Sequence, residues 1–135
     1  MVDINEICGE IIKNVPEALG CAVVDLSSGL LLAVSHKVPY FTQSYLDAAA
    51  AAAVDMIRGR TVTTVENMIA NMRGTQESMM IEEIQLTSKN TYHFMAVIPE
   101  KPSAMVILIT SKRASLGMGW ASVRQALPKL APLCP

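Results

Sequence analysis

The feature that most constrains this chain is an alanine-rich segment from Thr42 to Gly59, which contains six consecutive alanines. Alanine has the highest helix propensity, so the segment is predicted to be an α-helix. Ser44 is its predicted N-cap, and Asp47 completes a variant of the capping box. Gly59 is the predicted C′ residue at the other end. We expect the other elements to be arranged around this helix.

The larger side chains of that helix recur at i, i+3, i+4, i+7, i+8 and i+11, which places them on one face. They are Leu46, Ala49, Ala50, Ala53, Val54 and Ile57. So little side-chain bulk lets another backbone come close. In one interpretation the helix only presses on its own sheet. In the other, its outer face also docks a second copy or a partner.

Composition limits the kind of protein. The 135 residues are enough for one domain, expected to span residues 1–135. Hydrophobic residues make up 51% and charged residues 17%, so we expect apolar surface that a partner or a symmetric copy covers. The net charge of −1 and the lack of a basic stripe argue against nucleic-acid binding. No membrane span or signal peptide is expected, so we predict a cytoplasmic protein.

Flanking segments show the periodicity of helices and strands in the order α-β-β-α-α-β-β-β-α. The expected helices are Val2–Val15, the alanine segment, a short helix opened by a Thr63–Glu66 capping box and ended by Gly74, and a helix from about Ala114. The expected strands are Cys21–Leu26, Leu30–Ser35, Met79–Thr87, Thr91–Ile98 and Ser103–Thr110, the last being the most apolar and therefore central. This order predicts an α+β fold, a three-layer α/β/α sandwich with the alanine helix on one face and the terminal helices on the other.

Three local features refine that prediction. Adjacent Glu82 and Glu83 indicate a bulge or an exposed edge strand. The short helix has an apolar stripe of Val65, Met68, Ile69 and Met72, which suits core packing or an adaptable partner surface. Gly117 and Gly119 weaken the last helix but permit close approach to the sheet.

No catalytic, cofactor or metal site is predicted, and we expect a protein that is not an enzyme. His36 and His93 have no partner pattern, and Asp25 is expected to form a turn. Glu82 and Glu83 would point to opposite faces of a strand, so they cannot act as an acid–base pair. Three cysteines without CxxC spacing favour neither a disulfide framework nor a zinc site.

Three stretches resemble the roadblock / dynein light chain family. They are CAVVDLSSGLLLA (Cys21–Ala33), the alanine-rich helix, and AMVILITSKRASLG (Ala104–Gly117), and the likeness covers about Ile4 to Leu127. The resemblance implies a five-stranded antiparallel sheet in the order 2-1-5-4-3. It also implies a homodimer, or a heterodimer of paralogues, in which the third strands pair and the central helices pack together. The expected interface is Leu46, Ala49, Ala50, Ala53, Val54 and Ile57 of the helix, with Met80, Glu82 and Ile84 of the strand.

The resemblance further implies non-catalytic work, either binding or regulating a small Ras-like GTPase or serving as an adaptor in a signalling or motility assembly. The chain departs from the family pattern at Thr61–Arg73, an added helix that could cover the expected partner face. A small-ligand sensor domain is the alternative, and it would need a pocket with converging polar groups.

Overall fold

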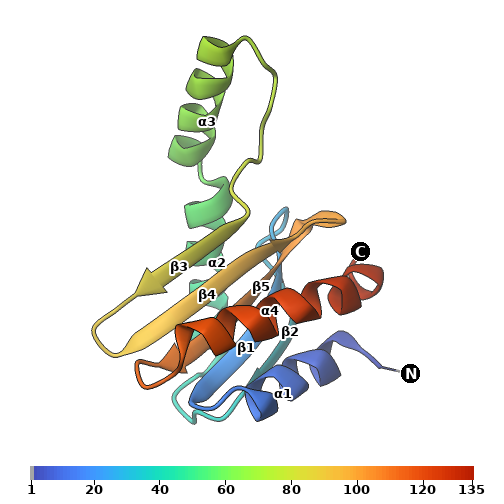
Figure 1. The fold of residues 1–135 in the computed structure, drawn as a ribbon, viewed down its shortest axis with the longest axis vertical. Coiled ribbons are helices and arrows are strands. Elements are labelled where there is room, and N and C mark those ends of the chain that lie inside the picture. Colours follow the sequence, from blue (N-terminus) through green and yellow to red (C-terminus); the bar gives the residue numbers. More distant parts are fainter. Residues whose placement is uncertain (1) are drawn as a thin grey trace.

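The computed structural model describes residues 2–135, which form four α-helices, five strands and a terminal 3-10 turn (Figure 1). The helices are α1 (Ile4–Asn14), α2 (Gln43–Arg58), α3 (Arg60–Arg73) and α4 (Leu116–Leu130), with the turn at Ala131–Leu133. The strands are β1 (Ala18–Asp25), β2 (Leu31–His36), β3 (Glu83–Thr87), β4 (Thr91–Ile98) and β5 (Lys101–Ser111). The predicted order of elements is confirmed.

The strands form one antiparallel sheet in the order β2-β1-β5-β4-β3. The expected order is therefore confirmed, with the apolar β5 at the centre and β2 and β3 at the edges. No strand connection crosses the sheet except through α2 and α3, which carry the chain from one edge to the other.

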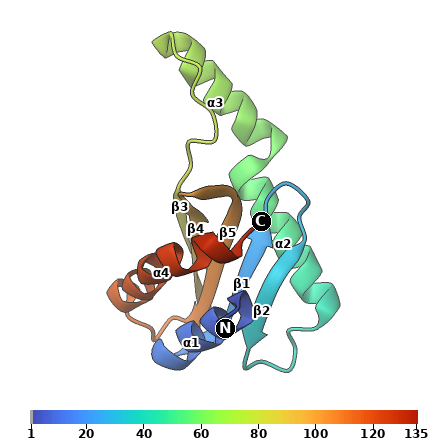
Figure 2. The ribbon, with the colours of Figure 1, turned by 90° about the vertical axis from the view of Figure 1, so that its right-hand side faces the viewer.

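The helices cover the two faces of the sheet as predicted (Figure 2). On one face α1 and α4 enclose the larger core, in which Ile11 and Leu130 pack with Val23, Phe94 and Leu108 of the sheet. On the other face α2 forms a smaller core. Its buried residues are Leu26, Ala53, Ile57, Met95, Val97 and Met105. Together these layers give a three-layer α/β/α sandwich.

Both α1 and α2 have a side-chain N-cap, and the one at α2 differs from the prediction. Asp3 caps α1 by accepting a hydrogen bond from the Glu6 backbone N–H at 2.8 Å. At α2 the predicted N-cap Ser44 is wrong, because Thr42 fills that position and accepts from the Tyr45 N–H at 3.3 Å. Asp47 instead accepts a hydrogen bond from the side chain of Gln43.

The joint between α2 and α3 also differs from the prediction. Gly59 is the C-cap of α2, but its φ of −61° and ψ of 158° are extended rather than left-handed, and the same residue is the N-cap of α3. The helix therefore restarts at Arg60 with no loop. The predicted Thr63–Glu66 capping box is wrong, because Glu66 lies inside α3 and its carboxylate accepts a hydrogen bond from the Met80 N–H.

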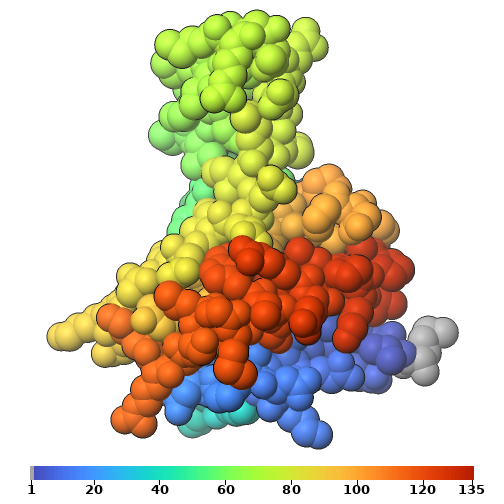
Figure 3. All heavy atoms as spheres, in the orientation of Figure 1, coloured from blue at the N-terminus to red at the C-terminus, as the bar shows by residue number. Residues whose placement is uncertain are grey.

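The added helix α3 does not lie on the sheet. It stands away from the three layers, beyond the end of α2, and the chain returns beside it to β3 (Figures 1 and 3). Whether this segment covers a partner face stays a prediction. We call α3 and the returning residues 75–82 the arm.

Strand β3 is shorter than predicted. The backbone of Met79 has a positive φ of 54°, which is incompatible with an extended strand, and the ladder to β4 begins at Glu83. No register shift interrupts that ladder, so the two adjacent glutamates mark an exposed edge rather than a bulge.

Candidate partner-binding surface

Only a narrow face of the alanine helix α2 is buried against the sheet. Ala50, Ala53 and Ile57 are the buried residues of α2, and they point at the sheet one helical turn apart. Ala48, Ala51 and Ala52 are exposed. Because these side chains are small, the helix approaches the sheet without spreading over it.

An apolar cleft therefore remains beside α2, on the face of the sheet that this helix covers. Its volume is about 160 Å³. The sheet contributes half-buried side chains that include Leu86, Ile107 and Ile109. The helix contributes Tyr45, Leu46, Ala49, Ala50, Ala52, Ala53 and Met56. The lining of the cleft is almost entirely apolar.

Four of the helix residues in the cleft form a regular seam. Tyr45, Ala49, Ala52 and Met56 recur at i, i+4, i+7 and i+11, the spacing with which one helix packs along another. The two central positions are alanines, so a second helix could come close at the middle of the seam. The sequence-derived stripe did not include Tyr45, Ala52 or Met56, because it is centred on the face that contains the buried Ala50, Ala53 and Ile57.

Two histidines line the cleft, and one ring nitrogen of each has a hydrogen-bond partner. His36 Nδ1 accepts a hydrogen bond from the Val38 N–H, and His93 Nε2 lies 2.9 Å from Thr91 Oγ1. Burial lowers the pKa of His93, so its neutral form is favoured in the folded chain. The cleft is thus suited to an uncharged apolar occupant.

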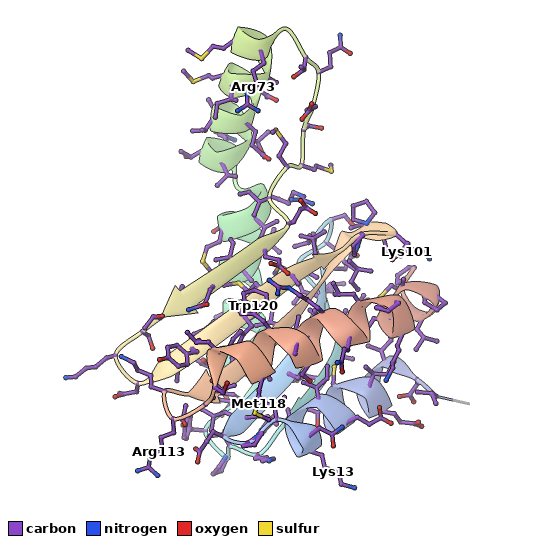
Figure 4. The ribbon with its side chains drawn as sticks, viewed as in Figure 1. Lys13, Arg73, Lys101, Arg113, Met118 and Trp120 are labelled. Atoms are coloured by element: carbon purple, nitrogen blue, oxygen red, sulfur yellow. The ribbon has the colours of Figure 1, made fainter. Side chains whose placement is uncertain are left out.

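The edge strand β3 borders this cleft. Ile84 and Leu86 pack toward α2, while Glu83 and Gln85 face α4. There the Glu83 carboxylate pairs with the guanidinium of Arg124 at 2.8 Å, and this pairing lowers the pKa of Glu83. The side-chain oxygen of Gln85 accepts a hydrogen bond from the indole N–H of Trp120, which is labelled in Figure 4. The face of β3 that carries Glu83 and Gln85 is therefore held in place by α4. The outer edge of β3 pairs with no other strand of the described chain.

The nine residues predicted for the interface are placed in three different settings. Ala50, Ala53 and Ile57 are buried against the sheet of their own chain, although Ala50 and Ala53 also line the cleft. Leu46, Ala49, Val54, Met80 and Ile84 are half-buried, and Glu82 is exposed. Met80 and Glu82 precede β3 rather than lying in it. Their role at an interface remains a prediction.

The methionine stripe of α3 is on the surface rather than in a core. Val65, Met68 and Ile69 are exposed, and Met72 is 84% exposed. The buried residues of α3 are Glu66 and Ala70, which face the returning segment. The arm thus presents a second apolar surface beyond the end of the cleft.

The Asp25 carboxylate is held within the turn that follows β1. Hydroxyls of Ser27 and Ser28 donate to the Asp25 carboxylate and lower its pKa, which is the turn-forming role expected from the sequence. Within residues 2–135 no cluster of side chains is suited to hold a metal ion. Over the same residues, no helix has the length and apolar character needed to cross a bilayer.

Comparison with known proteins gives matches at the level of structure. No protein-family model matches the sequence, and the search of curated proteins gives no match either. Among solved structures, a roadblock/LC7 domain from Streptomyces avermitilis is 12% identical, with 97% of each chain covered and a TM-score of 0.69.

Two MglB proteins are similar to the same extent. Myxococcus xanthus MglB is 16% identical, covering 96% of this chain and 93% of its own, with a TM-score of 0.70. The gliding protein MglB from Thermus thermophilus is 17% identical, covering 95% and 85%, with a TM-score of 0.70. These likenesses, together with the strand order, show that the chain has the roadblock/LC7 fold.

Proposed function

We propose that this chain is a non-catalytic interaction module that acts as a homodimer and binds or regulates a small Ras-like GTPase, or serves as an adaptor in a signalling or motility assembly. The observation that carries the proposal is the apolar cleft beside α2, on a fold that the chain shares with MglB proteins. An uncharged cleft of this kind is stabilised when another apolar surface displaces its water.

A second copy of α2 fits the cleft because the seam is self-complementary. In an antiparallel two-fold pair, Tyr45 lies opposite Met56 of the second copy, and Ala49 lies opposite Ala52. The two large residues then meet at the ends of the seam and the two small ones meet at the axis. Pairing of the two β3 edges would satisfy the outer backbone groups of both strands.

The sensor alternative has less support. Ligand pockets usually measure about 300–1,000 Å³ and contain several convergent polar groups. The cleft is smaller, at about 160 Å³, and both of its histidines already have hydrogen-bond partners. A wider hollow of about 640 Å³ at the base of the arm is lined by polar residues that include Arg58, Glu66 and Lys101, and a small ligand would be sought there.

Nucleotide-dependent capture tests the GTPase part of the proposal. The immobilised chain is incubated with lysate of its source cell in the presence of excess GDP or a non-hydrolysable GTP analogue, and retained proteins are identified by mass spectrometry. We expect a small GTPase that is retained more strongly in one nucleotide state.

A captured GTPase is then purified and titrated against the wild type and two matched variants. Ala52→Glu places a charge in the cleft, and Ala51→Glu places the same charge on the exposed side of the same helix turn. We expect Ala52→Glu to weaken binding and Ala51→Glu to retain it. If no small GTPase is retained in either nucleotide state, the GTPase assignment is wrong, while the dimer is tested separately by sedimentation.

A further inference from the structure

The exposed face of the arm has a composition that is unusual for a helix in water. Between Thr61 and Met72 the single ionisable side chain is Glu66, which is turned inward and accepts a hydrogen bond from Met80. The outward face over these turns carries Val65, Met68, Ile69 and Met72 without any charge. A helix surrounded by solvent normally has a charged face, so this one is suited to contact with protein.

Two arms are poorly suited to pair with each other. Arg60 is the first residue of α3, at the base of the arm. Arg73 is its last residue, near the free end of the arm (Figure 4). Antiparallel pairing would set Arg60 against Arg73 of the other arm, and parallel pairing would set each arginine against its own copy. Like charges at both ends oppose the contact in either direction.

The direction of the arm is fixed by its joint with α2. The Gly59 N–H donates to the Asp55 carbonyl at 3.0 Å, and a Cβ at Gly59 would come within 2.3 Å of that oxygen. Because no loop separates the two helices, the arm begins directly where the α2 seam ends. In the proposed antiparallel pair, the end of α2 that leads into Gly59 lies beside the start of α2 of the second copy, at Thr42. The arm therefore leaves its helix near the connector of the second copy that contains Tyr40.

The connector at that end of α2 exposes an aromatic surface. Tyr40 is 67% exposed and Tyr45 is 41% exposed. The buried ring of Phe41 supports both, stacking on Tyr45 at 4.9 Å and meeting Tyr40 edge-on at 5.4 Å between ring centroids. Methionine and branched aliphatic side chains pack well on aromatic rings, and the sulfur–aromatic contact is favourable.

We propose that the arm is a dimer clasp, in which the Val65–Met68 turn packs on the exposed ring of Tyr40 of the second copy. The clasp rests on the proposed α2-paired dimer and adds a second contact at each end of it. Two-fold symmetry gives two identical clasps per dimer.

Cysteine cross-linking between differently tagged, co-expressed chains tests this contact directly. The native Cys8, Cys21 and Cys134 are buried, so they do not compete at the surface. One chain carries Tyr40→Cys and the other Val65→Cys. We expect mild oxidation to join the two tags in one covalent dimer.

Two controls separate the clasp from the dimer beneath it. Asn67→Cys replaces Val65→Cys to test the polar side of the arm, and it should cross-link to Tyr40→Cys much less. Ala49→Cys with Ala52→Cys tests the α2 seam alone. If the seam pair cross-links but Tyr40→Cys and Val65→Cys do not, the clasp is wrong and the dimer stands. If neither pair cross-links, the proposed dimer fails as well.

A second measurement gives the strength of the clasp. Met68→Glu should raise the dissociation constant of the dimer by about tenfold, since truncating or charging a central contact commonly has effects of this size. Asn71→Glu, on the exposed polar side of the same helix, should leave the constant unchanged. Equal dissociation constants for both variants and the wild type would overturn the clasp.

Discussion

At the scale of single residues, the packing of α4 on the sheet depends on one glycine. A Cβ added at Gly119 would lie 2.5 Å from Cζ of Phe94. The Phe94 ring is fully buried and packs edge-on against Trp120 at 5.3 Å, so it has little room to move. The sequence predicted close approach at Gly117 and Gly119, and the structure confirms it for Gly119 alone, since Gly117 has no atom nearer than Ser115 Oγ at 3.8 Å.

We therefore expect Gly119→Ala to lower the free energy of unfolding by about 1–3 kcal/mol, the usual cost of overpacking a core. Gly117→Ala is the matched control. It should be neutral or slightly stabilising, because alanine is the better helix former and meets no obstacle. Urea unfolding of both variants measures the difference. Equal free energies of unfolding for the two variants would show that the Phe94 ring moves aside and that the close contact at Gly119 does not destabilise the fold.

At the scale of elements, sequence patterns located every helix and strand but misplaced several ends. Thr42 and Ser44 both offer hydroxyls to a helix N-terminus, and local chemistry does not choose between them. The choice is made by the buried ring of Phe41, which anchors the chain just before Thr42. The hydrogen bond from Met80 to Glu66 joins residues 14 apart in sequence, so the capping-box pattern at Glu66 could not reveal it.

The α2 N-cap gives a direct test at this scale. Thr42→Ala should lower the free energy of unfolding by about 1 kcal/mol, because the first turn of α2 loses a side-chain acceptor. Ser44→Ala should have little effect, since Ser44 is exposed within the first turn and alanine favours the helix. Thermal unfolding compares the two variants. A larger loss for Ser44→Ala would contradict the assigned cap.

At the scale of the whole molecule, the sequence predicted the layers and the sheet order but only part of the candidate surface. The helical stripe marks residues that face the sheet, and it contains the buried Ala50, Ala53 and Ile57. The cleft lies to one side of that stripe, where Ala52 and Met56 face sheet residues that are distant in sequence. Which side of a nearly uniform alanine helix stays open depends on its placement over the sheet. Periodicity alone does not determine that placement.

Sedimentation of the wild type beside Ala52→Glu and Ala51→Glu tests the central claim, a dimer formed through the cleft. At micromolar concentration the wild type and Ala51→Glu should sediment at twice the chain mass of 14.6 kDa. Ala52→Glu should sediment as a folded monomer, because its carboxylate would be buried without a partner in the dimer. A monomeric wild type, or an Ala52→Glu variant that remains dimeric, would contradict the account.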